Sequence, residues 1–118
     1  MRRGRPTESV WVFMLDTRAK LMAVHECARG GIDAAHVSVQ EIFRTALLVG
    51  AHSIILAHNH PSGDPSPSAE DQVFTARVRD AADLLGVQLL DHVVVAQSGF
   101  YSFADAGDKA LRKKECSV

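Results

Sequence analysis

The sequence predicts an α/β domain in which two helices pack on a mixed β-sheet. Strand-like apolar runs and stretches with helical apolar spacing follow one another in the order β-β-α-β-α-β-β, which is typical of this class. Of the 118 residues, 47% are hydrophobic and 23% charged, so the chain can bury a core and is not intrinsically disordered. Its length predicts one domain, over residues 8–104, between a frayed arm at 1–7 and a tail at 105–118.

The first two elements are predicted to be the strands of a hairpin. Val10–Leu15 is a run of β-branched, aromatic and aliphatic residues, which favours a buried strand with Trp11 in the core. A polar turn at residues 16–20 leads into a second strand at Leu21–Ala28, which carries Cys27 as a buried thiol. Glycines 30 and 31 interrupt that strand.

A helix and a central strand are expected next. Ser38 followed by Glu41 fits a capping box, which predicts a helix start, and Gly50 is a plausible stop. The short apolar run Ser53–His58 then suits the centre of a sheet. The residues expected on the apolar face of this helix are Ile42, Phe43, Ala46 and Leu47.

The second half predicts a long loop, a helix and two further strands. Asn59–Pro67 contains three of the four prolines and is expected to be irregular. Ser68 with Asp71 again fits a helix start, and Gly86 ends that helix. Strands are expected at residues 87–96 and 100–103. The apolar residues at helical spacing are Phe74, Val78, Ala81 and Leu85.

Charge and composition exclude several classes of function. With 13 basic and 14 acidic residues the net charge is −1, so no overall positive field favours nucleic acid. Basic residues at the two ends, in 2–5 and 109–114, are the main support for DNA binding. No apolar run approaches the roughly 20 residues of a membrane span, and two cysteines without a secretion signal indicate a cytoplasmic protein with reduced thiols.

The most informative feature is a cluster of potential metal ligands at residues 58–71. His58 and His60 are two positions apart, so on an extended backbone both side chains point to one side. Asp71 lies one turn inside the helix that Ser68 opens, where its carboxylate can face the strand end. Two histidines and one aspartate form a catalytic rather than a structural zinc set. Taken singly, the histidines could be solvated and Ser68 a simple cap, whereas Asp64 is expected to be a turn residue.

The joint pattern H-x-H-x(7)-S-x(2)-D resembles the signature of the JAMM (JAB1/MPN) zinc metallopeptidases. The string from His58 to Asp71, HNHPSGDPSPSAED, is similar to the RadC branch of that family, as is LLGVQLLDH at residues 84–92. The resemblance extends from about Glu8 to Phe103. It implies a three-layer α/β/α, deaminase-like JAB/MPN fold with a mixed sheet.

The resemblance also implies roles for individual residues. His58, His60 and Asp71 would bind one zinc ion per chain, and Ser68 would help to hold the oxyanion. A glutamate ahead of the first core strand would be the general base, and Glu8 matches that position, with Glu26 and Glu41 as rivals. The helix-hairpin-helix region usual in RadC proteins is not found in this sequence, which leaves substrate access open.

The function expected from this resemblance is zinc-dependent hydrolysis of a peptide or isopeptide bond in a peptide or protein substrate. The alternatives are a non-catalytic binding module associated with DNA repair or recombination, and a zinc hydrolase that acts on another bond. His92 beside Asp91 remains open, either as a second-shell pair or as a strand histidine packed near the sheet edge.

Overall fold

The computed structural model describes residues 8–30 and 37–111. The predicted arm at 1–7 and the last residues of the predicted tail, 112–118, lie outside the described residues, as do the basic residues within them. The described elements follow the predicted order, with a short 3₁₀ helix added in the tail. They are β1 Ser9–Leu15, β2 Leu21–Arg29, α1 Val39–Val49, β3 Ser53–Asn59, α2 Ala69–Leu85, β4 Gln88–Ala96, β5 Gly99–Ser102 and η2 Lys109–Leu111.

The strands form one mixed sheet in the order β2-β1-β3-β4-β5. The central pair β3–β4 is parallel, and β1–β2, β1–β3 and β4–β5 are antiparallel. This topology confirms the predicted α/β class with a mixed sheet. It also makes β3 a central strand, as its short apolar run predicts.

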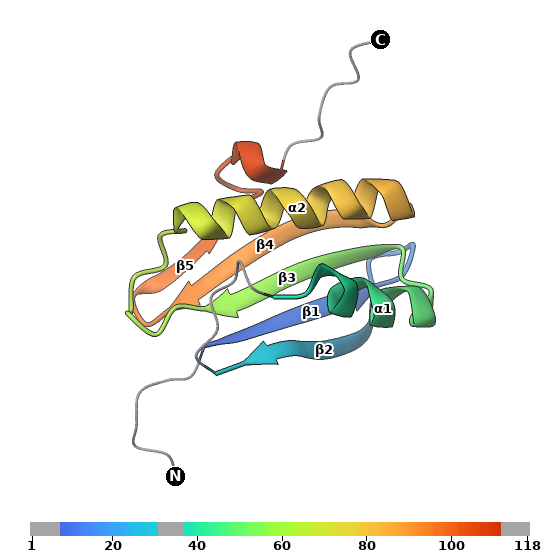
Figure 1. Cartoon of the computed structure of the whole chain (residues 1–118), viewed down its shortest axis with the longest axis horizontal. Coiled ribbons are helices and arrows are strands. Elements are labelled where there is room, and N and C mark those ends of the chain that lie inside the picture. Colours follow the sequence, from blue (N-terminus) through green and yellow to red (C-terminus); the bar gives the residue numbers. More distant parts are fainter. Residues whose placement is uncertain (1–7, 31–36, 112–118) are drawn as a thin grey trace.

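Both helices cover the same face of the sheet (Figure 1). The connections β2–α1–β3 and β3–α2–β4 cross the sheet in the same direction, and right-handed crossovers therefore place both helices on one side. Every second residue of the central strands contributes to this core, including Val12 on β1 and Leu56 on β3, which pair in register. The buried hydrophobic residues of the helices are Ile42, Phe43, Ala46, Phe74, Val78 and Ala82.

The opposite face of the sheet carries apolar side chains without a helix above it. Within residues 8–30 and 37–111, no second helical layer covers this face, so the described part of the fold has one helical layer and one sheet. Trp11, predicted to be core, lies here and exposes 38% of its surface. It pairs with Ala57, and the neighbouring Val95 is also exposed. The prediction for Trp11 was wrong because a strand pattern does not reveal which face is covered.

The helix ends follow the predicted caps, with one difference. The Ser38 side chain accepts a hydrogen bond from the Glu41 amide, and Gly50 ends α1 with a φ of 71°, a conformation that glycine adopts without a Cβ penalty. The Glu41 carboxylate, however, contacts His25 and Arg44 instead of completing a capping box. Leu47, predicted on the apolar face of α1, is half exposed.

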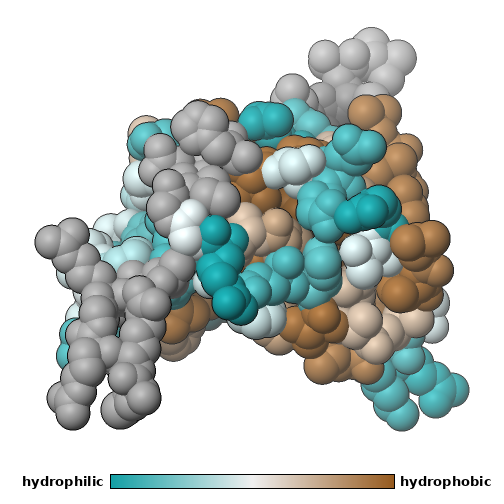
Figure 2. Space-filling view, turned by 60° about the horizontal axis from the view of Figure 1, so that its bottom comes forward, coloured by the Kyte–Doolittle hydropathy of each residue, from teal (hydrophilic) through white to brown (hydrophobic). Residues whose placement is uncertain are grey.

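Hydrophobic side chains also gather at one end of the helical layer. They form the brown region at the right of Figure 2, the end at which Figure 1 shows the carboxyl termini of both helices. The exposed apolar residues in the last turns of the helices are Leu47, Leu48, Val49, Leu84 and Leu85.

Within the described ranges, no helix is long and apolar enough to cross a membrane.

Candidate metal centre

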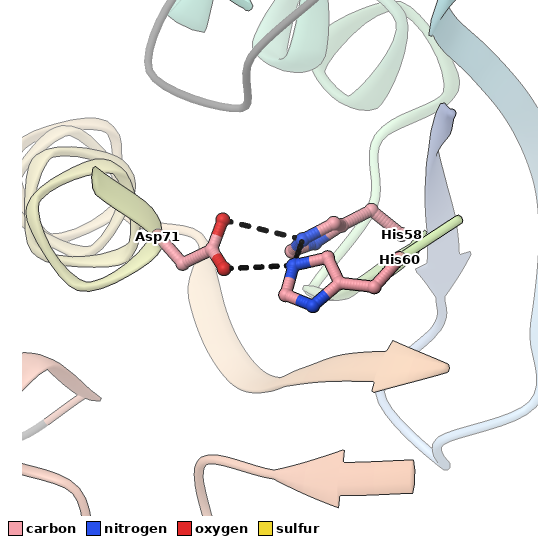
Figure 3. A group of neighbouring side chains, drawn as sticks. All are labelled: His58, His60 and Asp71. Atoms are coloured by element: carbon pink, nitrogen blue, oxygen red, sulfur yellow. Dashed lines mark hydrogen bonds and ion pairs between the residues drawn. The ribbon is translucent and has the colours of Figure 1, made fainter. Parts of the chain in front are cut away.

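The predicted metal ligands meet where β3 ends and α2 begins, at the left of Figure 1. His58 lies on β3 and is 1% exposed, and His60 follows the strand directly. The irregular loop 61–67 then returns the chain so that Asp71, in the first turn of α2, faces the two rings (Figure 3). The alternation of the strand and the capped start of the helix therefore bring the three side chains together.

Three ligand atoms converge between these side chains. The Nε2 atoms of His58 and His60 are 3.1 Å apart. Asp71 Oδ1 lies 3.3 Å from His58 Nε2, and Asp71 Oδ2 lies 2.9 Å from His60 Nε2. One atom from each of the three residues fits within a 4.8 Å cluster that could hold a metal ion.

The chemistry of these atoms fits a metal. Bonds of about 2.0–2.2 Å to a tetrahedral zinc ion place neighbouring ligand atoms about 3.3 Å apart, close to the separations observed. Moreover, His60 Nδ1 lies 3.0 Å from the Asp64 carbonyl oxygen. This oxygen can only accept, so Nδ1 carries a proton, and in the neutral ring Nε2 presents a lone pair. A cation between these atoms relieves the repulsion between electron pairs that point at one another.

Asp71 is held as a carboxylate by its surroundings. Burial acts to raise its pKa, but the hydrogen bond and positive charge that His58 supplies when protonated, the Ser68 amide, and the charge of a protonated His60 outweigh burial. The pKa of Asp71 therefore lies well below its usual value of 3.8. Because the ionised form is the one that binds a metal, the carboxylate is ready for coordination at neutral pH.

Ser68 forms a complete capping box with Asp71. The Ser68 hydroxyl accepts from the Asp71 amide at 3.0 Å, and the Ser68 amide donates to Asp71 Oδ2 at 2.8 Å. The cap thus orients a proposed metal ligand as well as starting the helix. Because the hydroxyl oxygen accepts in this pair, its own proton remains available to another acceptor.

A cavity of about 280 Å³ opens beside the cluster and also contains Glu8. Glu8 is half-buried, immediately before β1, and its backbone carbonyl accepts from the Gly30 amide. The residues that line this cavity are Glu8, His60, Pro61, Ser62, Ser68, Glu70 and Asp71. The cavity lining therefore includes four of the five predicted site residues, and the fully buried His58 is the one that it does not include.

The two rival glutamates lie elsewhere. Glu26 pairs with Trp11 across the strands, so it belongs to the sheet face away from the helices, and it binds Arg29 at 2.7 Å. Glu41 lies at the start of α1, where it contacts His25 at 2.9 Å and also binds Arg44. Neither of them lines the cavity that holds Glu8.

Two groups that orient the histidines are additional to the predicted site residues. The Asp64 backbone carbonyl holds His60, while the Asp64 side chain accepts from the Ser66 amide, as expected for a turn residue. His92 Nε2 lies 2.7 Å from His58 Nδ1. No local pattern marks a backbone carbonyl as a hydrogen-bond partner, and the position of His92 depends on the pairing of β4 with β3.

His92 is a neutral, fully buried imidazole. It exposes 0% of its surface and stacks on the Phe103 ring, with 4.9 Å between the ring centroids and 4° between the planes. Burial, reinforced by the neighbouring His58, lowers its pKa to about 3. Of the two predictions for this residue, the structure agrees with the one that places it next to the ligands. The contact is between the His92 ring and the His58 ring. The Asp91 carboxylate accepts from the His92 backbone amide, the Ser102 hydroxyl and the Ala104 amide.

The fold and the His-His-Asp cluster together define a JAB/MPN-type α/β domain with a possible metal site. A family model described as the RadC-like JAB domain matches residues 1–108. The chain belongs to this family. The resemblance seen in the sequence is thereby confirmed at the level of the domain.

Several curated relatives carry the name UPF0758 protein. The one from Carboxydothermus hydrogenoformans is 46% identical over 95 residues, which cover 80% of this chain and 42% of that protein. The one from Thermotoga maritima is 41% identical over 101 residues, covering 86% and 46%. The Vibrio cholerae relative is 47% identical over 104 residues, covering 88% and 65%. The chain thus spans less than half the length of the first two.

Proposed function

We propose that this domain is a zinc-dependent hydrolase that cleaves an amide bond in a peptide or protein, either a peptide or an isopeptide bond. One observation carries the proposal: the cavity that adjoins the His-His-Asp cluster also holds a glutamate and a serine hydroxyl. A metal site, a candidate base and a candidate oxyanion donor within one cavity are the parts that metal-assisted hydrolysis requires.

His58, His60 and Asp71 would hold the zinc ion. Three protein ligands leave a fourth position open, as in catalytic sites. When bound, zinc would lower the pKa of a coordinated water to about 7 and polarise the substrate carbonyl.

Glu8 would act as the general base and then as the general acid. Its carboxylate would take a proton from the attacking water as the carbon–oxygen bond forms. It would return that proton to the leaving amine as the carbon–nitrogen bond breaks. The Ser68 hydroxyl would donate a hydrogen bond to the oxyanion while its oxygen continues to accept from the Asp71 amide and cap α2.

Metal content and activity of matched variants test this function. Wild-type protein is expected to bind about one zinc ion per chain, measured by mass spectrometry of untagged protein, and His60→Ala is expected to lose the metal and the activity. Glu8→Gln should retain zinc and lose about 10²- to 10⁴-fold in turnover of a peptide or isopeptide substrate.

Glu26→Gln and Glu41→Gln are the matched controls. Each makes the same change at a glutamate that does not line the cavity, Glu26 on β2 and Glu41 on α1. Turnover should therefore stay near that of wild type. Full activity in Glu8→Gln would assign the base to another group. Wild-type protein without zinc, even after zinc is supplied, would refute the hydrolase and turn attention to a binding role.

A further inference from the structure

A chain of hydrogen bonds joins two of the proposed ligands through the interior of the protein. It begins at the Asp71 backbone carbonyl, which is 2.8 Å from the Thr75 hydroxyl on the next turn of α2. Thr75 Oγ1 lies 2.5 Å from His92 Nδ1 on β4. His92 Nε2 in turn lies 2.7 Å from His58 Nδ1 on β3.

The available protons and lone pairs determine which atom donates in each hydrogen bond of this series. The Asp71 carbonyl can only accept, so the one hydroxyl proton of Thr75 is donated to it. Thr75 Oγ1 must then accept from His92, which places the His92 proton on Nδ1. A neutral His92 consequently presents a bare Nε2, which accepts a proton from His58 Nδ1. His58 is left with its lone pair on Nε2, the atom that faces His60 and Asp71.

The surrounding packing fixes the middle of the chain. Thr75 and His92 each expose 0% of their surface. The His92 ring stacks on Phe103 and meets the edge of Phe74, with centroids 5.9 Å apart and planes at 79°. Because neither polar side chain can turn to water, a reversed proton arrangement would leave Thr75 Oγ1 at 2.8 Å from the Asp71 carbonyl oxygen with no proton between the two oxygens.

We propose that His92, oriented by Thr75, is a positioning residue that holds His58 in the tautomer with its proton on Nδ1 and its ligand lone pair on Nε2. This inference rests on the proposed metal function, since its consequence is metal affinity. Partners of this kind beyond the ligands set the ring orientation and tautomer of a metal-binding histidine. Here the hydrogen-bond chain also links α2, which carries Asp71, to β3, which carries His58, in the absence of a metal ion.

The two histidines therefore depend on different parts of the protein. His60 is oriented by a carbonyl of the exposed loop, at Asp64. His58 is oriented by the buried chain from α2 and β4. Substitutions in that chain should affect His58 and leave the tautomer of His60 unchanged.

The matched pair Thr75→Val and Thr75→Ser tests the chain. Valine keeps the shape of threonine and removes the hydroxyl, whereas serine keeps the hydroxyl. Thr75→Val should weaken zinc binding by about 10- to 100-fold, measured by competition with a chromophoric chelator, and Thr75→Ser should restore most of the affinity. His92→Phe, which keeps a ring against Phe103, should weaken binding similarly, with partial rescue in His92→Gln.

Nitrogen NMR of the zinc-free protein gives a readout that a general loss of stability would not produce. In wild-type protein, His58 Nε2 should show the shift of an unprotonated ring nitrogen. In Thr75→Val and His92→Phe, it should move toward the protonated value while His60 stays unchanged. A folded Thr75→Val protein with the wild-type His58 tautomer and a zinc affinity within twofold of wild type would overturn the inference.

The same spectrum separates this inference from the proposed function. If wild-type protein does not bind zinc, the hydrolase proposal fails. The positioning role of His92 can still be tested in that case, because the His58 tautomer is measured in the metal-free protein. An Nε2-protonated His58 in wild-type protein would refute that role whatever the zinc result.

Discussion

Cys27 shows how the environment of one residue changes its chemistry. It packs against the edge of the core on β2, beneath α1. Burial first, and then the negative charges of Glu41 and Glu26, raise its pKa from an ordinary value of 9.0 to about 12. The thiolate is the reactive form of cysteine, so Cys27 is expected to be an inert thiol at neutral pH.

Alkylation by iodoacetamide at pH 8 tests this prediction. In a Cys116→Ser background, which leaves Cys27 as the remaining thiol, native protein should react many times more slowly than protein unfolded in urea. The physical reason is that folding reduces both the solvent access of the half-buried Cys27 and its thiolate fraction. Equal rates in native and unfolded protein would contradict the burial of Cys27.

The same shift predicts a pH dependence of stability. The pKa of Cys27 is higher in the folded state, so folding favours the protonated thiol. Its contribution to the free energy of unfolding is complete below about pH 9 and is lost between about pH 9 and 12. Urea unfolding across this range should show a smaller decline for Cys27→Ala than for wild type, and identical declines would refute the shift.

In the proposed hydrolase, the first turn of helix α2 would combine a structural and a chemical function. Ser68 caps the helix and lies in the cavity with Glu8. Asp71 completes the capping box and faces the histidines. Under the proposed function, this one element would supply a ligand, the group that orients that ligand, and a hydroxyl for the substrate. Its capping and catalytic contributions must therefore be separated by experiment.

Two substitutions at Ser68 separate these contributions. Ser68→Ala should lower the free energy of unfolding by about 1 kcal/mol, whereas Ser68→Gly should cost only a few tenths. Both remove the hydroxyl, so both should reduce turnover to a similar extent. Urea unfolding and steady-state kinetics give the two quantities.

Ser38→Ala serves as the control, because it removes the equivalent cap of α1 at a distance from the cavity. It should cost about 1 kcal/mol of stability and leave turnover near wild type. Turnover that follows stability across all three variants would mean that Ser68 acts as a cap alone.

At the scale of the whole molecule, the two faces of the sheet differ in their packing. Phe74 of α2 is 0% exposed in the core beneath the helices. Trp11 lies on the face that no described helix covers and exposes 38% of its surface. The same change, truncation of an aromatic ring, therefore has different costs on the two faces.

Phe74→Ala should lower the free energy of unfolding by about 3–5 kcal/mol, because it leaves a cavity next to the His92 ring. Trp11→Ala should cost clearly less, because part of its surface is already in contact with water and no enclosed cavity forms. Urea unfolding of the two variants measures the difference. Equal costs would show that the outer face of the sheet is covered in solution.

Much of the fold could be predicted because its signals are local. The helix ends are marked by contacts within a few residues, at the N-caps Ser38 and Ser68 and the C-caps Gly50 and Gly86. The strands follow from apolar runs. By contrast, the exposure of Trp11 and Leu47 depends on which surfaces distant elements cover, and no local pattern contains that information.

The candidate site divides in the same way. The spacing of His58, His60 and Asp71 is local enough for the sequence to predict a metal cluster, because a single loop joins the end of the strand to the start of the next helix. The location of Glu8 beside that cluster, and of Glu26 and Glu41 away from it, follows from strand pairing and helix packing.

The sequence by itself determined the class of fold, the order of its elements, the helix caps and the three potential ligands, all of which depend on residues close together in the chain. The tertiary structure decided that both helices share one face, that Glu8 opens into the ligand cavity, and that His92 and Thr75 support His58. These arrangements join β1, α2 and β4 across dozens of residues. They form only when the whole core packs, because each of these hydrogen bonds and buried faces requires two elements that are distant in the sequence.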